Sequence, residues 1–176
     1  MSEYYLHTEN INEWVGTLAA GDKVYLSGTI YTARDAAHKR IVNAINAEEE
    51  LPFDINNSVV YYAGPTPAKG SLATGSIGPT TSSRMDVFSP VLLAKGQKAM
   101  IGKGNRSQKV IESMKAYGAV YFAAVGGAGA LYCQCIKSSE VVAFDDLGCE
   151  SVKRLQIEKF PLVVAIDSNG GSLYKK

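Results

Sequence analysis

The chain has 176 residues, of which 46% are hydrophobic and 20% are charged. These proportions are typical of a globular protein and exclude a disordered or a fibrous chain. Eighteen Lys and Arg residues stand against seventeen Asp and Glu residues, so the net charge of +1 offers no general attraction to a phosphate backbone. We therefore expect one domain over residues 1–176 and no nucleic-acid partner.

The hydropathy pattern also argues against a membrane or an exported protein. No apolar run approaches the roughly 20 residues that are needed to cross a bilayer. The first ten residues, MSEYYLHTEN, lack the basic and then apolar order of a signal peptide. We expect a cytoplasmic protein without a membrane partner.

The first predicted element is a helix within an N-terminal lead-in of residues 1–20. Asn10 and Glu13 have the spacing of a helix N-cap and its reciprocal glutamate. Gly21 ends the helical run. Before it, apolar residues recur at helical spacing: Ile11, Trp14, Val15 and Leu18. This apolar face predicts that the helix packs against the rest of the domain.

Strands and helices alternate irregularly along the remaining chain. Short apolar or β-branched runs bounded by Gly, Pro or Asp predict strands at residues 23–27, 59–63, 119–125, 141–144 and 162–166. Helical patterns lie between several of them, at residues 35–49, 108–117 and 129–136. Other strands are separated only by turns. This mixture predicts an α/β fold with a mixed sheet and flanking helices.

Three cysteines, Cys133, Cys135 and Cys149, form an odd set in a chain without an export signal. A disulfide framework is therefore not expected. Three thiolates would also suit an iron-sulfur cluster with one open iron, but the single residue between Cys133 and Cys135 differs from the usual cluster spacings. We favour small buried hydrophobic residues over metal ligands.

The polar segment at residues 27–40 is the first candidate for a binding site. A predicted strand breaks at Gly28, and Arg34 falls near the start of a helix. An arginine at this place suits a bidentate contact with a carboxylate, and the helix N-terminus favours an anion. The alternative for Arg34 is a surface ion pair with Asp35 or a neighbouring residue. His38, one turn further, is interpreted as a supporting or surface residue.

The segment at residues 75–86, GSIGPTTSSRMD, holds four consecutive hydroxyl residues before an arginine. Hydroxyls at Thr80 and Thr81 suit carboxylate oxygens or, when desolvated and well placed, proton exchange with a substrate. Arg84 supplies the charge that a dicarboxylate requires. The alternative is a hydrophilic loop that caps a helix beginning near Arg84.

Two glycine-rich segments follow predicted strands. GKGNR at residues 102–106 fails the nucleotide-binding pattern, because Lys103 is followed by Gly104 and not by Ser or Thr. Lys103 instead suits a point charge that faces an anion. GGAGAL at residues 126–131 lacks the glycine order of a dinucleotide-binding turn, so we expect close backbone packing there.

Two arginines, a lysine and a hydroxyl cluster together predict a site for a small molecule with two carboxylates. The sequence shows no metal-ligand spacing, no nucleophile with its base and no cofactor fingerprint. Chemistry on such a molecule would therefore need a second component.

At these residues the sequence resembles a known family. The segments SGTIYTARDAAHKR, YYAGPTPAKG, GPTTSSRMD, IGKGNRS, YFAAVGGAGAL, FDDLGCES and KFPLVVAIDSNGGSLY occur in this order. They are similar to the β subunit, or equivalently the C-terminal domain, of class I fumarases and L(+)-tartrate dehydratases. The similarity runs from about Gly21 to Tyr174.

The resemblance implies a swivelling β/β/α domain and a hydro-lyase that is active only with an α subunit. Three cysteines of that subunit would hold a four-iron four-sulfur cluster, and the usual assembly is a pair of α/β heterodimers. The implied reaction is the reversible hydration of fumarate to malate, with conversion of tartrate to oxaloacetate as the alternative.

The resemblance also implies roles for individual residues. It assigns the substrate carboxylates to three basic side chains: Arg34, Arg84 and Lys103. It makes Thr80 the group that exchanges a proton at carbon, with Thr81 beside it and His38 in support. A free hydroxyl is a weak base, so Thr80 would need electrostatic help. The competing hypotheses are a stand-alone dicarboxylate-binding module and a non-catalytic domain kept for assembly.

Overall fold

The computed structural model describes residues 1–174. Its strands are β1 (Glu3–His7), β2 (Lys23–Thr32), β3 (Val59–Tyr61), β4 (Ala99–Gly102), β5 (Val120–Ala123), β6 (Ile136–Ala143) and β7 (Val152–Ile166). Its α-helices are α1 (Ile11–Trp14), α2 (Asp35–Asn46), α3 (Ser89–Ala94), α4 (Gln108–Tyr117) and α5 (Gly129–Tyr132). Short 3₁₀ turns occupy Thr8–Asn10, Ser82–Met85, Cys133–Cys135 and Asp145–Glu150.

The strands form one mixed sheet in the order β1-β2-β3-β4-β5-β7-β6, with an additional pairing of β2 and β7. Strands β1 to β5 run parallel to their neighbours, and β7 runs antiparallel to β2, β5 and β6. The pairings of β2, β3, β4, β5 and β7 therefore form a closed circuit. The expected α/β class with a mixed sheet and flanking helices is confirmed.

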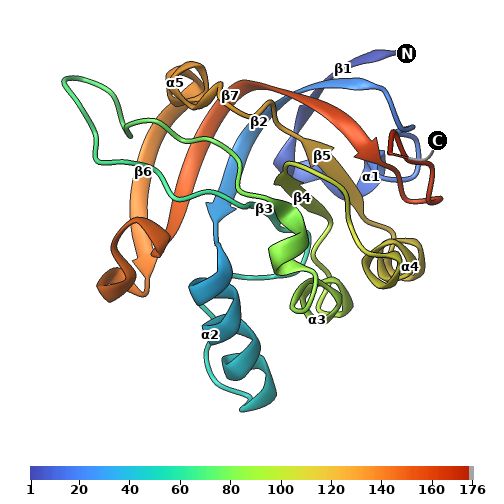
Figure 1. The fold of residues 1–176 in the computed structure, drawn as a ribbon, viewed down its shortest axis with the longest axis horizontal. Coiled ribbons are helices and arrows are strands. Elements are labelled where there is room, and N and C mark those ends of the chain that lie inside the picture. The colour runs from blue at the N-terminus through green and yellow to red at the C-terminus, as the bar shows by residue number, and fades with distance from the viewer. Residues whose placement is uncertain (175–176) are drawn as a thin grey trace.

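Alternation along the parallel strands sends side chains into two separate apolar cores. Tyr61 and Phe122 join the core that lies between the parallel and the antiparallel parts of the sheet. Tyr62 and Tyr121 join the core beneath the helices, which also contains Ile41 of α2. Figure 1 shows α2, α3 and α4 together along one side of the sheet, and α5 at the opposite side. The parallel strands thus separate two apolar cores, and helices cover one of them.

Gly28 lets the long strand β2 pair with both the parallel and the antiparallel strands of the sheet. The register between β2 and β7 shifts between Leu26 and Gly28, and Gly28 has a φ of 108°. A side chain there would also collide with Thr8 and His7 of the preceding segment. Glycine is therefore required at this bulge by its backbone angle and by the close approach of its neighbours.

The N-terminal segment differs from the expected helical lead-in. Residues 3–7 form β1, which pairs in parallel with β2. The helix after Asn10 is a single turn, and the Asn10 side chain forms no capping hydrogen bond. The preceding 3₁₀ turn gives Asn10 a φ of −113° and ψ of 20°, which is not the extended geometry of a capping residue. The predicted apolar face is nevertheless buried, as Ile11, Val15 and Leu18 show.

Several predicted elements have different lengths in the structure. β7 covers fifteen residues, although only residues 162–166 were expected, because the polar and apolar alternation from Val152 onward also belongs to the strand. β6 begins at Ile136 and not at residue 141. The helix expected at residues 129–136 ends at Tyr132 and continues as a 3₁₀ turn.

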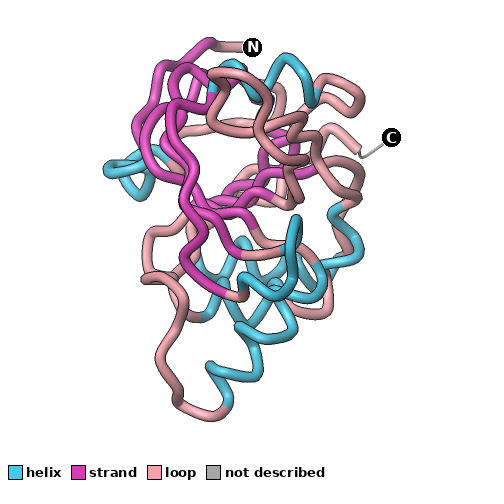
Figure 2. Tube along the Cα trace, turned by 90° about the vertical axis from the view of Figure 1, so that its left-hand side faces the viewer, coloured by secondary structure: helices cyan, strands magenta, loops and turns pink. Residues whose placement is uncertain are grey.

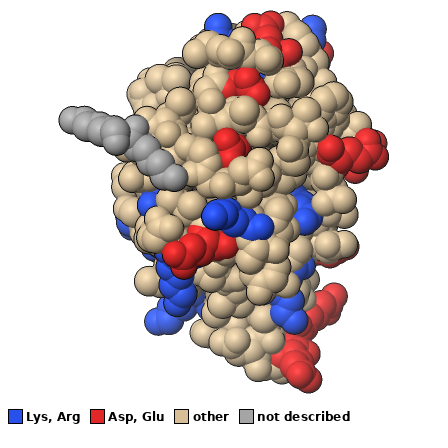
Figure 3. All heavy atoms as spheres, turned by 90° about the vertical axis from the view of Figure 1, so that its right-hand side faces the viewer, with Lys and Arg blue, Asp and Glu red and all other residues tan. Residues whose placement is uncertain are grey.

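The view turned by 90° separates the strands from most of the helices. Figure 2 shows the strands mainly in the upper part of the molecule and most of the helical turns below them. The face that carries α1, α4 and the C-terminal end has Lys and Arg atoms interspersed with Asp and Glu atoms (Figure 3). No single sign of charge dominates that face.

We predict that Phe160→Ala strongly destabilises the fold. Phe160 is fully buried, and its ring centroid lies 5.5 Å from that of Tyr61 and 4.7 Å from that of Tyr132. Truncation should leave a cavity and lower the free energy of unfolding by about 3–5 kcal/mol, measured by urea denaturation. The exposed Val87 supplies the control, since Val87→Ala should change this free energy by less than about 0.5 kcal/mol. Equal effects of the two changes would contradict the prediction.

Candidate functional site

The candidate site lies where the parallel strands end. β2, β3, β4 and β5 run in the same direction, so their carboxyl ends meet at one edge of the sheet. In open sheets of parallel strands, ligands bind at this edge, in the loops that follow the strands. The segments after these four strands contain each of the basic and hydroxyl residues predicted from the sequence.

Arg34 follows β2 and occupies the N-cap position of α2. Its side chain lies over Gly64, after β3: a Cβ placed on Gly64 would be 3.3 Å from both Cδ and Nη1 of Arg34. The Nε atom is buried without a hydrogen-bond partner, and Glu150 Oε1 is 3.8 Å away. The ion pair considered as the alternative thus involves Glu150 and not Asp35, and it is loose enough to leave a donor unsatisfied.

The hydroxyl segment is joined to the ends of β3 and β4 by backbone hydrogen bonds. The N–H of Thr80 donates to the carbonyl of Tyr62, with an N···O distance of 2.7 Å. Thr81 pairs with Lys103 as an isolated parallel bridge, and the N–H of Ser82 donates to the carbonyl of Lys103 at 2.9 Å. The segment therefore extends the sheet past its edge, and this brings Thr80 and Thr81 beside Lys103.

Two glycines, Gly126 and Gly102, leave room for Lys103 and for the hydroxyl segment beside it. A Cβ on Gly126, after β5, would be 3.5 Å from Cδ and 3.9 Å from Nζ of Lys103. A Cβ on Gly102 would collide with the Ser82 hydroxyl and lie 3.0 Å from Tyr62 Cδ2. A larger residue at Gly102 would force the Ser82 side chain to move and would crowd the contact between the hydroxyl segment and β4.

The glycine-rich segment at residues 126–131 packs closely against the hydroxyl segment. A Cβ on Gly129 would lie 2.8 Å from the backbone nitrogen of Gly78, and the N–H of Ile77 donates to the carbonyl of Gly129. The expected close backbone packing is confirmed. Tyr61 of β3 also holds the hydroxyl segment, since its hydroxyl donates a hydrogen bond to the carbonyl of Ile77 at 2.7 Å.

Arg84 lies in the 3₁₀ turn after the hydroxyl segment and pairs with Asp35 through two atoms. Arg84 Nε is 2.9 Å from Asp35 Oδ1, and Nη2 is 2.9 Å from Oδ2. The Arg84 side chain is 52% exposed and that of Asp35 is 33% exposed. Such an ion pair contributes only about 0–1 kcal/mol to stability, so its main effect is on the orientation of the guanidinium.

His38 is fully buried, which excludes the surface place considered for it. Its Nδ1 lies 2.9 Å from the Arg34 carbonyl oxygen, which can only accept, so Nδ1 carries the hydrogen. Its Nε2 is buried without a partner. Burial, aided by the positive charge of Arg106, lowers the pKa of His38 to about 4, so the neutral ring fixes the backbone at Arg34.

Arg106 was not predicted, although it supports the whole edge. It is buried, its Nε donates to Asp86 Oδ1 at 2.7 Å, and its guanidinium carbon is 5.3 Å and 5.1 Å from the ring centroids of Tyr62 and Tyr121. Asp86 also accepts from the N–H of Ser107 at 2.6 Å. This pair ties the turn that carries Arg84 to the loop that carries Lys103. The sequence offered no signal that distinguishes a buried arginine from an exposed one.

Tyr121 of β5 forms a second support under the same loops. Its hydroxyl donates to the carbonyl of Gly104 at 2.8 Å and lies 2.8 Å from the Ser82 hydroxyl. Burial raises the pKa of Tyr121, so the hydroxyl keeps its proton and remains a donor. These two hydrogen bonds hold both the loop that carries Lys103 and the neighbouring hydroxyl segment.

The cysteines do not fit a metal cluster on this chain. Cys133 is buried and its thiol lies 2.9 Å from the carbonyl oxygen of Ala130, whereas Cys149 is exposed. Burial raises the pKa of the Cys135 thiol, which disfavours a thiolate. Within residues 1–174, no group of three or more His, Cys, Asp or Glu side chains is suited to hold a metal ion.

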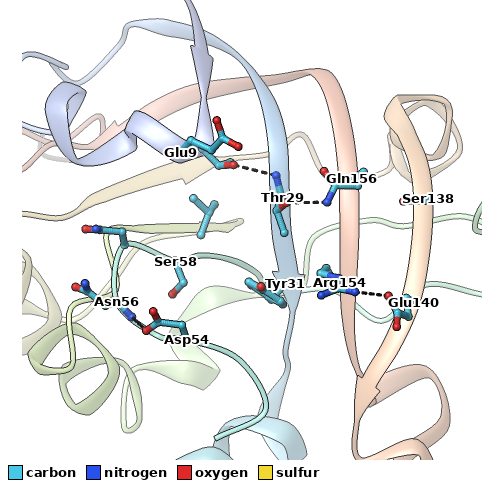
Figure 4. A pocket seen from close by; sticks show the side chains of 13 residues that line it. Glu9, Thr29, Tyr31, Asp54, Asn56, Ser58, Ser138, Glu140, Arg154 and Gln156 are labelled. Carbon is cyan, nitrogen blue, oxygen red and sulfur yellow. Dashed lines mark hydrogen bonds and ion pairs between the residues drawn. The ribbon is translucent and has the colours of Figure 1, made fainter.

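A separate groove of about 550 Å³ lies on the exposed face of β2, β7 and β6 (Figure 4). Its polar side chains pair among themselves: the Gln156 amide donates to the Thr29 hydroxyl at 2.7 Å, and Arg154 pairs with Glu140. None of the predicted site residues lines it. The groove is therefore distinct from the edge where those residues gather.

We predict that His38 makes stability depend on pH below neutrality. Its pKa is lowered from 6.5 to about 4 on folding, so between these values the unfolded chain binds a proton that the folded chain does not. Stability from this group is present above about pH 6.5 and is lost as the pH falls, by up to about 3 kcal/mol. Urea denaturation from about pH 7 to about pH 4.5 should show this loss in the wild type.

His38→Gln should remove this part of the pH dependence, whatever its effect on stability at neutral pH. His7, whose side chain is 48% exposed, provides the control, since His7→Gln should keep the wild-type difference between the two pH values. An unchanged pH dependence in His38→Gln would contradict the assignment.

No helix within residues 1–174 has both the length and the apolar character needed to cross a membrane.

Comparison with known proteins identifies the family. Residues 2–176 match the family model described as fumarase C-terminus. The chain is 44% identical over 168 residues to the putative L(+)-tartrate dehydratase subunit beta of Methanocaldococcus jannaschii, covering 92% of this chain and 86% of that protein.

The chain is also similar to longer relatives. It is 34% identical over 170 residues to fumarate hydratase 2 of Leishmania major, and 36% identical over 156 residues to the anaerobic class I fumarate hydratase of Escherichia coli. These matches cover 96% and 88% of this chain but only 30% and 28% of the respective relatives. The chain therefore belongs to the fumarase C-terminus family.

Proposed function

We propose that this chain is the β subunit of an iron-sulfur-dependent hydro-lyase that reversibly hydrates fumarate to malate. The observation that carries the proposal is the meeting of Arg34, the Thr80–Thr81 segment and Lys103 at one edge of the sheet, with Arg84 joined to them through Asp35. Three cations and two hydroxyls in the loops at one edge suit a small dianion with a reacting carbon between its carboxylates.

Arg34, Arg84 and Lys103 are proposed to bind the two carboxylates. Arg34 offers a buried donor without a partner, and Arg84 has a guanidinium edge that Asp35 does not occupy. Lys103 supplies a point charge beside the hydroxyls. Thr81 is proposed to complete this set, and His38 to hold the backbone of Arg34.

Thr80 is proposed to exchange the proton at the substrate carbon. A threonine hydroxyl is a weak base, and nearby positive charge favours its deprotonated form. Lys103 is adjacent through the pairing of Thr81, and the backbone bond from Thr80 to Tyr62 fixes the position of the residue.

The second component is proposed to be an α subunit, in a pair of α/β heterodimers, that carries a four-iron four-sulfur cluster. When bound, such a cluster would supply a Lewis acid for the substrate hydroxyl. The misfit of this chain's cysteines as cluster ligands agrees with that division. We further propose that residues 1–176 form a single swivelling β/β/α domain, which the two apolar cores on either side of the parallel strands support, and that the assembly is cytoplasmic.

The second candidate substrate is L(+)-tartrate, which would be converted to oxaloacetate. It is favoured by the 44% identity to a tartrate dehydratase subunit that the chain matches over 86% of its length. Reconstitution with an α subunit, followed by assays on fumarate, malate and tartrate, tests both candidates. Binding of these dianions without turnover in the reconstituted pair would favour a stand-alone binding module instead.

We predict that Arg84→Ala lowers kcat/KM of the reconstituted pair by about two decades or more. A lost charged contact to a carboxylate in a desolvated site costs a few kcal/mol, and about 1.4 kcal/mol corresponds to a factor of ten. Arg40→Ala is the control, because Arg40 also pairs with an aspartate, Asp146, and does not belong to the proposed site. A near-normal kcat/KM for Arg84→Ala would show that the site is wrongly assigned.

We predict that Thr80→Val lowers kcat by roughly two to four decades, as expected for a lost general base. Substrate should still bind, since the three cations remain, and binding of a slow substrate analogue can be measured separately. Thr80→Ser keeps the hydroxyl and should retain far more activity. If Thr80→Val instead raised KM and left kcat within about tenfold, Thr80 would be a binding residue and not the base.

A further inference from the structure

We infer that Asp35 is a positioning residue of this site: it orients the Arg84 guanidinium so that one edge faces the substrate carboxylate. The inference rests on the proposed function and extends it to a residue with no role assigned so far. Asp35 is the first residue of α2 and follows Arg34 directly. The start of α2 thus carries Arg34, one proposed substrate ligand, and Asp35, the ion-pair partner of a second proposed ligand, Arg84.

The geometry of the pair decides which edge of Arg84 is available. A guanidinium presents five N–H donors in a rigid plane, enough for bidentate contacts on two edges. Asp35 occupies the edge formed by Nε and Nη2: Nε donates a hydrogen bond to Oδ1 at 2.9 Å, and Nη2 lies 2.9 Å from Oδ2 as an ion-pair contact that is not aligned for a hydrogen bond. Nη1 forms no hydrogen bond with any residue in the range 1–174. The remaining edge, Nη1 with the second hydrogen of Nη2, matches the two oxygens of a carboxylate.

The backbone that carries Asp35 is held in place by His38. The buried His38 ring and the His38 backbone N–H both donate to the carbonyl oxygen of Arg34, at 2.9 Å and 2.8 Å. This fixes the peptide between Arg34 and Asp35 at the helix start. The Asp35 carboxylate is joined to this fixed backbone by only two side-chain torsions, whereas the Arg84 side chain is long and has many rotamers.

The two proposed arginine ligands are held in different ways. Arg34 lies over Gly64 and has Glu150 at 3.8 Å, too far for a hydrogen bond, so it depends on packing for its place. Arg84 is half exposed and lacks such packing. Without Asp35, the Arg84 guanidinium would have to be ordered when the substrate binds, and affinity would fall by that cost.

Stability alone does not account for the pair. Exposed ion pairs contribute little to folding. Arg40 and Asp146 form another exposed arginine–aspartate pair, with hydrogen bonds at 2.8 Å and 2.6 Å, from the same helix α2 to the 3₁₀ turn at Asp145–Glu150. Neither residue belongs to the proposed site, so this pair serves as the structural reference.

The test compares Asp35→Asn with Asp146→Asn in the reconstituted pair. Asp35→Asn should raise KM for the dicarboxylate about tenfold and leave kcat within about threefold, because the carboxylate contact is made in both the ground state and the transition state. Asp146→Asn should change neither constant. The Tm of both variants should stay close to that of the wild type. An unchanged or lowered KM in Asp35→Asn would overturn the inference, the latter because Asp35 would then compete with substrate.

A double variant shows whether Asp35 acts through Arg84. In an Arg84→Ala background, Asp35→Asn should have no further effect on kcat/KM. A full additional loss would mean that Asp35 acts on something else and would overturn the inference. Absence of hydratase activity in the wild-type pair would overturn the proposed function, whereas an active wild type with normal Asp35→Asn kinetics would overturn only the present inference.

A readout without catalysis completes the test. In the ¹⁵N-labelled chain, the Arg84 Nε–H should give a slowly exchanging NMR signal, assigned by its loss in Arg84→Lys. The signal should vanish or exchange rapidly in Asp35→Asn and persist in Asp146→Asn. Persistence in Asp35→Asn would show that Asp35 does not hold the guanidinium and would overturn the inference independently of activity.

Discussion

The antiparallel pairing of β2 with β7 is the constraint on which the rest of the structure depends. It connects the two ends of the parallel strands β2 to β5 into a closed circuit, so their carboxyl ends are held at fixed spacing. The candidate site is made of the segments that leave these ends. Its loops need little rigidity of their own, because the closed sheet fixes where each of them begins.

The sequence predicted the fold class well and the element lengths less well. Apolar runs identified β3, β5 and the end of β7, and α4 matched its predicted bounds. The long amphipathic half of β7 was missed, because its face toward solvent is polar and its pattern gives no continuous apolar signal. β1 and the shortness of α1 depend on pairing with β2, which is a tertiary effect that local patterns do not contain.

The site residues were predicted from residue type and from resemblance, and their roles stay predictions. The supports beneath them were not predicted. Arg106 and Tyr121 contact both loops from the helix-side core, and nothing in GKGNR or AVYFAAV indicates that a guanidinium is buried between two tyrosine rings. The partner of Arg84 was missed for the same reason, since Asp35 and Arg84 are 49 residues apart in sequence. The kind of ligand that a site binds can be inferred from its residue types. The residues that hold the site in place cannot, because they depend on contacts between segments that are distant in sequence.

The crowding at Gly102 has a consequence for comparing relatives of this protein. No Cβ can stand there without displacing the Ser82 hydroxyl, and Tyr62 blocks the other side. A relative with even an alanine at this position must have moved the side chain equivalent to Ser82 or replaced it by a smaller one. Glycine at this position together with serine at position 82 is therefore a simple criterion for sorting homologous sequences: those that keep both can share the packing of the hydroxyl segment on β4 that is described for this chain, and those that lack the glycine need a different contact there even where each charged residue is retained.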